Sequence, residues 1–279
     1  MNLERRIVSV HIEKTAGTSV QDFLESTLGK DKVLVYNPLD DTVSRAVDLK
    51  VQRTHPAHDL LRLGITRTPL AYIVNRAYLL LSYNVLKSKA IQIAEMPDDF
   101  SAIHGHFVAD RFDRQIANPI SVIVIRDPLE RMRSQYAHWR RTKGATQWRV
   151  RVPFSQHLSF EDYAFLPELR NYQTQALADK TLGDFAVVGV ADDLDTYIGR
   201  MIDCMQREGL MPANKNKTFK TKWLNRSPGV ERSAQEYSCE FLRRFYDLHE
   251  EDFKLYESAR RLAGGFSTQV DSQVNSHVV

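Results

Sequence analysis

Apolar residues along the chain fall into two patterns: short continuous runs, and longer stretches in which they recur every three or four positions. Continuous runs bounded by polar residues are typical of buried strands, and the wider spacing is typical of amphipathic helices. Predicted strands cover residues 6–12, 32–36, 102–107, 120–126 and 185–190. Predicted helices cover residues 18–28, 70–87, 128–142, 167–179, 193–208 and 231–262. Because strands and helices alternate, we predict an α/β fold whose mostly parallel central sheet is flanked by helices on both faces.

The length and composition of the chain indicate one globular unit. It has 279 residues, of which 43% are hydrophobic and 26% are charged, and a chain of this kind can bury a large core. We predict a single domain over residues 1–263. Residues 40–100 are too many for a simple crossover and predict a helical insertion near the site. Residues 264–279 are small and polar, which predicts a flexible C-terminal tail.

Charge, cysteine content and hydropathy exclude several classes of protein. The net charge of +3 is too small to favour nucleic-acid binding. Cys204 and Cys239 lie in helix-like stretches and indicate no disulfide framework. The most hydrophobic stretch, residues 70–86, is interrupted by polar and charged residues and predicts a buried helix, not a membrane span. The first strand begins near Arg6 with no signal peptide before it. We therefore expect a soluble cytoplasmic protein of bacterial origin.

The loop between the first predicted strand and the first predicted helix has an unusual composition. Residues 11–19 read His-Ile-Glu-Lys-Thr-Ala-Gly-Thr-Ser. Thr18 or Ser19 can cap the helix, with Gln21 or Asp22 as the partner in a capping box. Backbone N–H groups at a helix N-terminus bind anions, most often phosphate, and Lys14 adds a positive charge. The order differs from a Walker A loop, in which the lysine directly precedes the helix serine or threonine.

A second polar motif follows the apolar run at residues 120–125. Arg126 ends this predicted strand, Asp127 suits the N-cap of the next helix, and Pro128 suits its first position. Open α/β sheets bind ligands at the carboxyl ends of their strands, and a guanidinium group suits a phosphate. Arg126 is therefore a candidate anion ligand; a structural salt bridge to a nearby carboxylate is the alternative. Ser134 lies two turns into the helix.

The third motif is His104-Gly105-His106, inside the strand-like segment 102–107. Alternate residues of a strand face the same side, so both imidazoles can point into one cleft. A histidine titrates near neutral pH and can take a proton from an alcohol as the alcohol attacks. A His-x-His pair is also half of a metal site, but the sequence offers no convincing partner cluster. We predict no metal.

Together these motifs resemble those of sulfotransferases that use PAPS (3′-phosphoadenosine 5′-phosphosulfate), in particular the carbohydrate family that includes heparan sulfate 2-O-sulfotransferase. The loop is similar to the family's His-Ile-Pro-Lys-Thr-Ala-Gly-Thr-Ser and departs from it at Glu13. The Arg-Asp-Pro-x-x-Arg-x-x-Ser-x-Tyr pattern from Arg126 is similar to the family's 3′-phosphate motif, and the family carries a similar His-Gly-His. Asn171 begins a stretch similar to the family's Asn-x-x-Thr-Arg-x-Leu, in which Gln175 replaces the arginine. The resemblance covers residues 6–20 and 102–136 well, and 171–190 loosely.

The resemblance implies a P-loop NTPase-like sulfotransferase fold and transfer of the sulfuryl group of PAPS to an acceptor hydroxyl. The acceptor it favours is a carbohydrate, as a glycan or a sugar-containing metabolite. His106 would be the general base, His104 would assist it, and Lys14 would bind the bridging oxygen. The residues implied to hold PAPS are Lys14, Thr15, Ala16, Gly17, Thr18 and Ser19 at the 5′-phosphate, and Arg126 and Ser134 at the 3′-phosphate. This chemistry needs no metal, because lysine and backbone amides neutralise the charge.

Two other functions fit parts of the sequence. Residues 122–127 loosely mimic a Walker B strand that ends in aspartate, which would suit a nucleotide-dependent kinase. A non-catalytic nucleotide- or glycan-binding protein of the same fold is the second alternative. The basic stretches 140–151 and 215–222 either contact ligand or are solvated surface. The sequence leaves open the identity of the acceptor and the oligomeric state.

Overall fold

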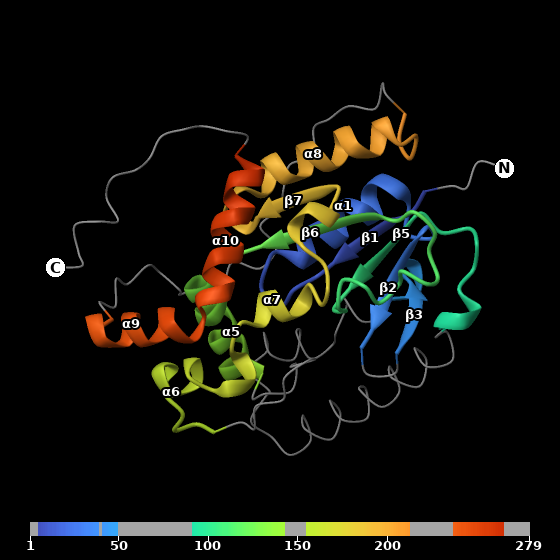
Figure 1. The fold of residues 1–279 in the computed structure, drawn as a ribbon. Helices are drawn as coiled ribbons and strands as arrows, with labels where there is room; N and C mark the ends of the chain where they lie inside the picture. Colours follow the sequence, from blue (N-terminus) through green and yellow to red (C-terminus); the bar gives the residue numbers. More distant parts are fainter. Residues whose placement is uncertain (1–4, 39–40, 50–90, 143–154, 213–236, 265–279) are drawn as a thin grey trace, which may run out of the picture.

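The computed structural model describes residues 5–38, 41–49, 91–142, 155–212 and 237–264 (Figure 1). A seven-stranded sheet runs through the described part in the order β4-β3-β2-β5-β1-β6-β7. Its strands are β1 (Ile7–Val10), β2 (Val33–Asn37), β3 (Thr42–Arg45), β4 (Ile91–Gln92), β5 (Ala102–Gly105), β6 (Ile120–Ile125) and β7 (Val187–Val190). The five strands predicted from the apolar runs are the five parallel ones, β2, β5, β1, β6 and β7.

Helices cover both faces of the sheet, as predicted. The α-helices are α1 (Gly17–Leu28), α5 (Pro128–Thr142), α6 (Phe160–Ala164), α7 (Tyr172–Ala176), α8 (Leu194–Arg207), α9 (Cys239–Leu248) and α10 (Glu250–Ala263). On one face Phe23 of α1 and Met201 of α8 pack with Val122 of β6. On the other face Ala176 of α7 and Ala259 of α10 belong to a second apolar cluster. The result is a three-layer α/β fold with a mostly parallel sheet.

A third apolar cluster lies beyond the end of the sheet, where α5, α6 and α9 meet (Figure 1). It is largely aromatic: Trp139 of α5 stacks on Tyr136 and contacts Tyr163 of α6 in a tilted arrangement, and Phe245 contributes from α9. Aromatic pairs at these distances add to the free energy gained from burying their surface. The cluster fixes α5, and α5 carries one side of the site described below.

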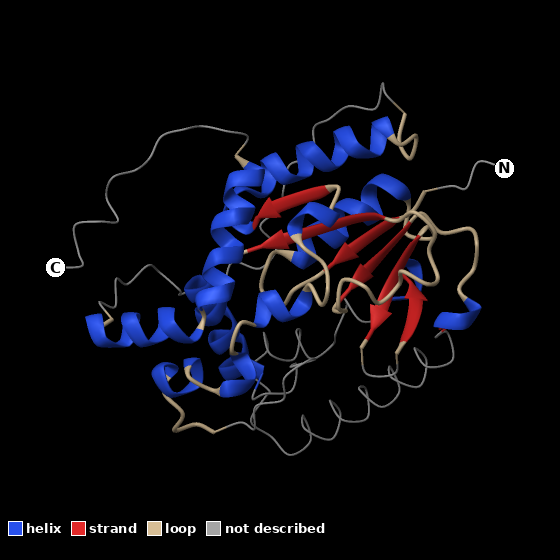
Figure 2. Ribbon diagram, in the orientation of Figure 1, coloured by secondary structure: helices blue, strands red, loops and turns tan. Residues whose placement is uncertain are grey.

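The structure corrects four details of the prediction. Residues 42–45 and 91–92, inside the range predicted as a helical insertion, form β3 and β4, which pair antiparallel and widen the sheet (Figure 2). The helix predicted over residues 167–179 is a 3-10 turn, Pro167–Leu169, followed by the short α7. The predicted helix 231–262 is two helices, α9 and α10, which meet at His249, and α6 was not predicted. The predicted helix 70–87 and all but the first residue of the predicted tail lie outside the described residues.

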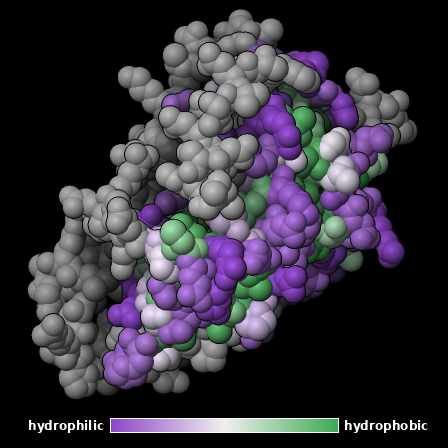
Figure 3. Space-filling view, turned by 60° about the vertical axis from the view of Figure 1, so that its left-hand side comes forward, coloured by the Kyte–Doolittle hydropathy of each residue, from purple (hydrophilic) through white to green (hydrophobic). Residues whose placement is uncertain are grey.

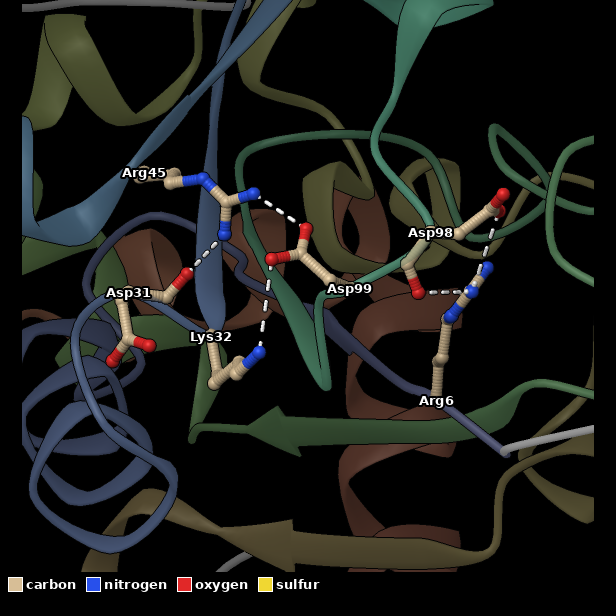
Figure 4. A network of polar contacts seen from close by, with 6 residues as sticks. All are labelled: Arg6, Asp31, Lys32, Arg45, Asp98 and Asp99. Atoms are coloured by element: carbon tan, nitrogen blue, oxygen red, sulfur yellow. Dashed lines mark hydrogen bonds and ion pairs between the residues drawn. The ribbon is translucent and has the colours of Figure 1, made fainter.

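A network of charged side chains ties together the edge of the sheet at which the parallel strands begin (Figure 4). The carboxylate of Asp99, just before β5, accepts from Arg45 Nη2 at 2.5 Å and lies 3.7 Å from Lys32 Nζ. Arg6, just before β1, donates to the Asp98 carbonyl at 2.7 Å. The Arg45 hydrogen bond lowers the pKa of Asp99. Ion pairs as exposed as these contribute little stability individually, and they lie at the edge opposite to the site.

The described surface is mainly polar. On the face displayed in Figure 3, hydrophobic residues emerge in small separate patches among hydrophilic ones. The exposed large hydrophobic residues of the described part are Val47, Tyr246 and Leu262. Both cysteines are free, Cys204 buried and Cys239 exposed. Among the described helices, none has the length and apolar character needed to cross a membrane.

Candidate functional site

The three sequence motifs meet at the carboxyl edge of the parallel strands. β1 lies between β5 and β6 in the sheet, so the segments that follow these strands are neighbours. Arg126, after β6, donates from Nη1 to the carbonyl oxygen of Lys14, after β1, at 3.1 Å. The chain leaves β1 toward β2 on one side and leaves β6 toward β7 on the other. The carboxyl ends of β1 and β6 therefore flank the switch point at which open α/β sheets bind ligands.

The loop after β1 has a constrained backbone. Lys14 and Ala16 both have left-handed φ angles, 70° and 69°, which for non-glycine residues cost about 1–3 kcal/mol each. The loop is held by Thr15, whose Oγ1 donates to the Ile12 carbonyl at 2.9 Å. A left-handed residue followed by a helical one, as at Ala16 and Gly17, turns successive N–H groups toward one side and forms an anion-binding concavity.

The cap of α1 differs from the prediction. Ala16 occupies the N-cap position without a side-chain hydrogen bond, so the predicted cap at Thr18 or Ser19 is wrong. Both residues lie inside the first turn. The left-handed turn at Ala16, which no residue type in the loop signals, starts the helix earlier than its polar residues indicate. An alanine at the cap leaves the first turn without a capping oxygen, and that arrangement suits an external anion.

The ring of His11 fills the space beside Gly17. A Cβ atom on Gly17 would lie 1.8 Å from His11 Nε2, closer than any two such atoms can approach. The loop, the start of α1 and the His11 ring are therefore packed together at this glycine.

Gly17→Ala is expected to destabilise the protein by about 1–3 kcal/mol, because the His11 ring must move to admit the methyl group. The matched control is Gly199→Ala in α8, where a Cβ meets nothing within 4 Å and where alanine should stabilise the helix by about 1 kcal/mol. Thermal unfolding of the two variants measures the difference. Equal shifts in melting temperature would contradict the close packing at Gly17.

Three histidines form a stack on the α1 face of the sheet. The ring of His11 lies 4.0 Å from that of His106 and 5.1 Å from that of His104, between centroids. His106 Nδ1 lies 2.9 Å from the carbonyl oxygen of His11. A carbonyl only accepts, so the proton of neutral His106 sits on Nδ1 and the lone pair on Nε2. This tautomer gives His106 a basic nitrogen. The sequence prediction left His11 without a role.

His104 lies in the interior and not in a cleft. It is 2% exposed, and its Nδ1 is hydrogen-bonded to Ser9 Oγ at 2.9 Å. Burial, and then the neighbouring His106, lower the pKa of His104 to about 3. Both imidazoles of the motif contact the His11 ring, but the side chain of His104, inside β5, is buried. His104 is therefore a neutral packing partner at neutral pH.

Positive charge is concentrated around Lys14. Burial, the nearby guanidinium of Arg141, and then that of Arg126 lower the pKa of Lys14 to about 8, while Glu13 raises it. His138 accepts from Arg141 Nη2 through Nδ1 at 2.9 Å. Burial, Lys14 and Arg141 lower the pKa of His138 to about 4, so this imidazole is neutral. Cations held together in this way favour a bound anion that carries more than one charge.

One face of α5 carries most of these groups. Ser134, His138 and Arg141 are spaced by four and three residues, which places them on the same side of a helix. Arg126 lies just before α5, where the predicted N-cap is present: Asp127 Oδ1 accepts from the N–H of Glu130 at 2.9 Å. His138 was not singled out in the sequence, although its spacing from Ser134 could have identified it.

The backbone of Arg126 is held by α7. Gln173 accepts from the N–H of Arg126 at 3.0 Å and donates to its carbonyl at 2.8 Å. Asp252 of α10 in turn accepts from the N–H groups of Gln173 at 3.1 Å and Thr174 at 2.8 Å. The stretch from Asn171 thus lies beside the second motif. The Arg126 side chain also lies 3.9 Å from Glu130, a weak ion pair that leaves the guanidinium partly exposed.

The predicted site residues therefore fall into two groups. Those that come together at the carboxyl edge are Lys14, Thr15, Ala16, Gly17, Thr18, Ser19, His106 and Arg126, with Ser134 on the face of α5 that carries His138 and Arg141. His104 lies beneath them. Within the described residues, no group of three histidine, cysteine or acidic side chains could hold a metal ion. Of the two basic stretches, residues 143–151 and 215–222 lie outside the described residues.

Comparisons with known proteins give little further information. No family model matches the chain, and no curated protein matches it. Among solved structures, the crystal structure of a sulfotransferase from Alicyclobacillus acidocaldarius is similar over 91% of this chain and 95% of that one, with 14% sequence identity and a TM-score of 0.42. A likeness of this strength does not establish a shared activity.

Proposed function

We propose that this chain is a PAPS-dependent sulfotransferase that transfers a sulfuryl group to the hydroxyl of an acceptor. The observation that carries the proposal is the contact of 3.1 Å between Arg126 Nη1 and the Lys14 carbonyl. It joins two motifs that lie more than a hundred residues apart and that each suit a phosphate. PAPS carries anionic groups at both ends of its ribose, so it needs two neighbouring anion sites.

The loop would hold the 5′-phosphosulfate. In this proposal the N–H groups at the start of α1 and the hydroxyls of Thr18 and Ser19 bind the 5′-phosphate, and Thr15, whose hydroxyl donates to the Ile12 carbonyl, holds the loop in place. The ammonium of Lys14 binds the oxygen that bridges phosphorus and sulfur. Arg126 and Ser134 bind the 3′-phosphate from the far side of the switch point. The left-handed backbone at Ala16 and the uncapped first turn of α1 support the loop assignment.

The reaction would be an in-line displacement at sulfur. The acceptor oxygen forms a bond to sulfur while the bond between sulfur and the bridging oxygen breaks, and 3′,5′-ADP leaves. The proton of the acceptor hydroxyl passes to Nε2 of His106, and Lys14 stabilises the negative charge that grows on the leaving oxygen. The hydrogen bond from His106 Nδ1 to the His11 carbonyl supports this choice of base, because it places the proton on Nδ1 and the lone pair on Nε2. No step requires a metal.

The acceptor proposed is a carbohydrate hydroxyl, on a glycan or a sugar-containing metabolite. This part of the proposal rests on the resemblance of residues 11–19 and of the His-Gly-His segment to the carbohydrate sulfotransferases. Screening of acceptors that differ in the sugar ring and in the free hydroxyl identifies which hydroxyl is sulfated.

A thermal-shift experiment tests the cofactor class. We expect 3′,5′-ADP to raise the melting temperature more than 5′-ADP does, because only the former fills both anion sites. A ligand at a hundred times its dissociation constant adds about 2.7 kcal/mol to the free energy of unfolding. Arg126→Ala should remove the preference for the 3′-phosphorylated nucleotide, whereas Arg133→Ala in α5, the helix that follows Arg126, should keep it.

Each other outcome has a definite meaning. Stabilisation by ATP with magnesium alone would identify a kinase-like protein. Stabilisation by 3′,5′-ADP without sulfuryl transfer to any sugar acceptor would favour a non-catalytic binding protein. An Arg126→Ala variant that prefers 3′,5′-ADP as strongly as the parent would contradict the 3′-phosphate assignment.

A further inference from the structure

Glu13 is the position at which the loop departs from the motif that it resembles, and its carboxylate is buried. The residue is 6% exposed. Its Oε2 accepts a hydrogen bond from Gln135 Nε2 of α5 at 2.8 Å. A buried carboxylate is costly unless hydrogen bonds and opposite charge compensate it, so its partners indicate what it does.

Those partners form a buried chain across three elements. The Oε1 of Gln135 accepts from Nη1 of Arg131, and both side chains are at most 2% exposed. The Arg131 guanidinium lies 4.7 Å from the centroid of the Tyr172 ring on α7. The carboxylate of Glu13 and the guanidinium of Arg131 thus balance each other through one glutamine. The chain links the loop after β1 to α5 and α7.

Glu13 is also the negative charge nearest to the Lys14 ammonium in sequence, and the other charges that bear on Lys14 are positive. Arg126 approaches from the end of β6 and Arg141 from α5. His138 of α5 and the half-buried His11 at the end of β1 also lie near Lys14, and burial lowers the pKa of both imidazoles. Among the described groups that affect Lys14 appreciably, Glu13 alone opposes the loss of its proton. A single carboxylate therefore both fixes the loop against α5 and offsets the surrounding cations.

We propose that Glu13 is a positioning residue of this site, whose buried carboxylate holds the loop against α5 through Gln135 and keeps Lys14 protonated among the cations. The role of Lys14 in catalysis rests on the proposed function. The effect of Glu13 on the protonation of Lys14 does not rest on it, because that protonation can be measured without any nucleotide.

Glu13→Gln isolates the charge. The substitution keeps the size of the side chain and an oxygen that can accept from Gln135, but removes the negative charge. Competitive labelling with acetic anhydride over a range of pH, read by mass spectrometry, gives the pH at which Lys14 is half reactive. We expect this midpoint to fall by about one unit, the lower end of the shift that a nearby opposite charge typically causes, because Glu13 is the group that raises the Lys14 pKa.

Glu25→Gln is the matched control. Glu25 of α1 is also buried, at 3% exposure, and also accepts from a glutamine, Gln21, at 2.8 Å. It is not among the groups that shift the Lys14 pKa. The control should leave the Lys14 midpoint unchanged. A midpoint in Glu13→Gln that stays at the parent value, or rises, would overturn the proposal.

Glu13→Asp isolates the contact with α5, since it keeps the charge on a side chain too short to reach Gln135 at the same backbone position. We expect the labelling midpoint to stay near that of the parent and the affinity for 3′,5′-ADP to fall by about tenfold. An unchanged affinity would show that the Gln135 contact does not position the loop. If the parent binds no 3′,5′-ADP, the proposed function fails, while the labelling of Glu13→Gln still decides the role of the charge.

Discussion

Lys14→Ala is expected to lower turnover with PAPS by about 10²- to 10⁴-fold, the range typical of a group that stabilises charge in the transition state. Negative charge grows on the bridging oxygen as the bond to sulfur breaks, and the Lys14 ammonium is the cation assigned to it. The substitution keeps the backbone carbonyl that accepts from Arg126, so the contact between the two motifs should persist. Single-turnover measurement with saturating PAPS separates the loss in chemistry from any loss in binding.

Lys254→Ala is the control for this variant. Lys254 on α10 pairs with Glu250 and Glu251 at the surface, and its removal should leave turnover unchanged. A loss of less than threefold in Lys14→Ala would contradict the role assigned to the ammonium.

The lowered pKa of Lys14 predicts where activity is lost on the alkaline side of the pH profile. Burial and the guanidinium groups of Arg141 and Arg126 lower its pKa from 10.5 to about 8 in the free protein. The protonated form of Lys14 is the active one, and kcat/KM reports the protonation of the free protein. We therefore expect kcat/KM to have its full value well below pH 8 and to fall as the pH rises through about 8. A bound phosphosulfate stabilises the ammonium, so the limb in kcat should lie at higher pH. Lys14→Ala should abolish the limb in kcat/KM.

Long continuous apolar runs were the best guide to the fold. The run at residues 120–125 became β6, which is buried along its whole length, and β1 is equally buried. Such strands are specified by their own composition, because both faces of a parallel sheet are covered. β3 and β4 have only four and two residues and lie toward one edge of the sheet. β3 is as long as β1, but Val43 is its only apolar residue, and β4 is too short to form an apolar run, so the sequence does not reveal either strand.

The break between α9 and α10 shows a second limit of sequence patterns. The helical spacing continues through His249, where the two helices meet. The His249 ring is buried, with Nδ1 accepting from the N–H of Asn171 at 3.4 Å and Nε2 lying 3.2 Å from the Ala164 carbonyl. These partners come from segments about eighty residues away in the chain. A tertiary contact of this kind overrides local propensity.

The site likewise contains features that the sequence reveals and contacts that only the fold reveals. The loop motif and the Arg126 motif are each contiguous in sequence, and the residue types alone indicate an anion site. The His11–His106 stack and the Glu13–Gln135 contact join residues 95 and 122 positions apart. A periodic pattern in the sequence does not reveal such pairs, because these residues meet only when β1, β5 and β6 lie side by side in the sheet.

His106→Ala is expected to lower turnover by about 10²- to 10⁴-fold, the typical contribution of a general base, with little change in the affinity for 3′,5′-ADP. The reason is geometric: Nδ1 donates to the His11 carbonyl at 2.9 Å, so the lone pair that can take the proton of the acceptor hydroxyl is on Nε2. His157→Ala, an exposed histidine near α6, controls for loss of an imidazole and should leave turnover unchanged.

His104→Ala separates the two histidines of the motif. Because its ring is buried against Ser9, its loss should destabilise the protein by about 2–4 kcal/mol through the cavity and the unpaired hydroxyl. Below its lowered melting temperature this variant should still bind 3′,5′-ADP and retain more turnover than His106→Ala. Near-normal turnover in His106→Ala, beside a large loss in folded His104→Ala, would reverse the assignment of the base. If His106→Ala loses turnover and folded His104→Ala keeps it, the proton acceptor is His106, and His104 supports it by packing.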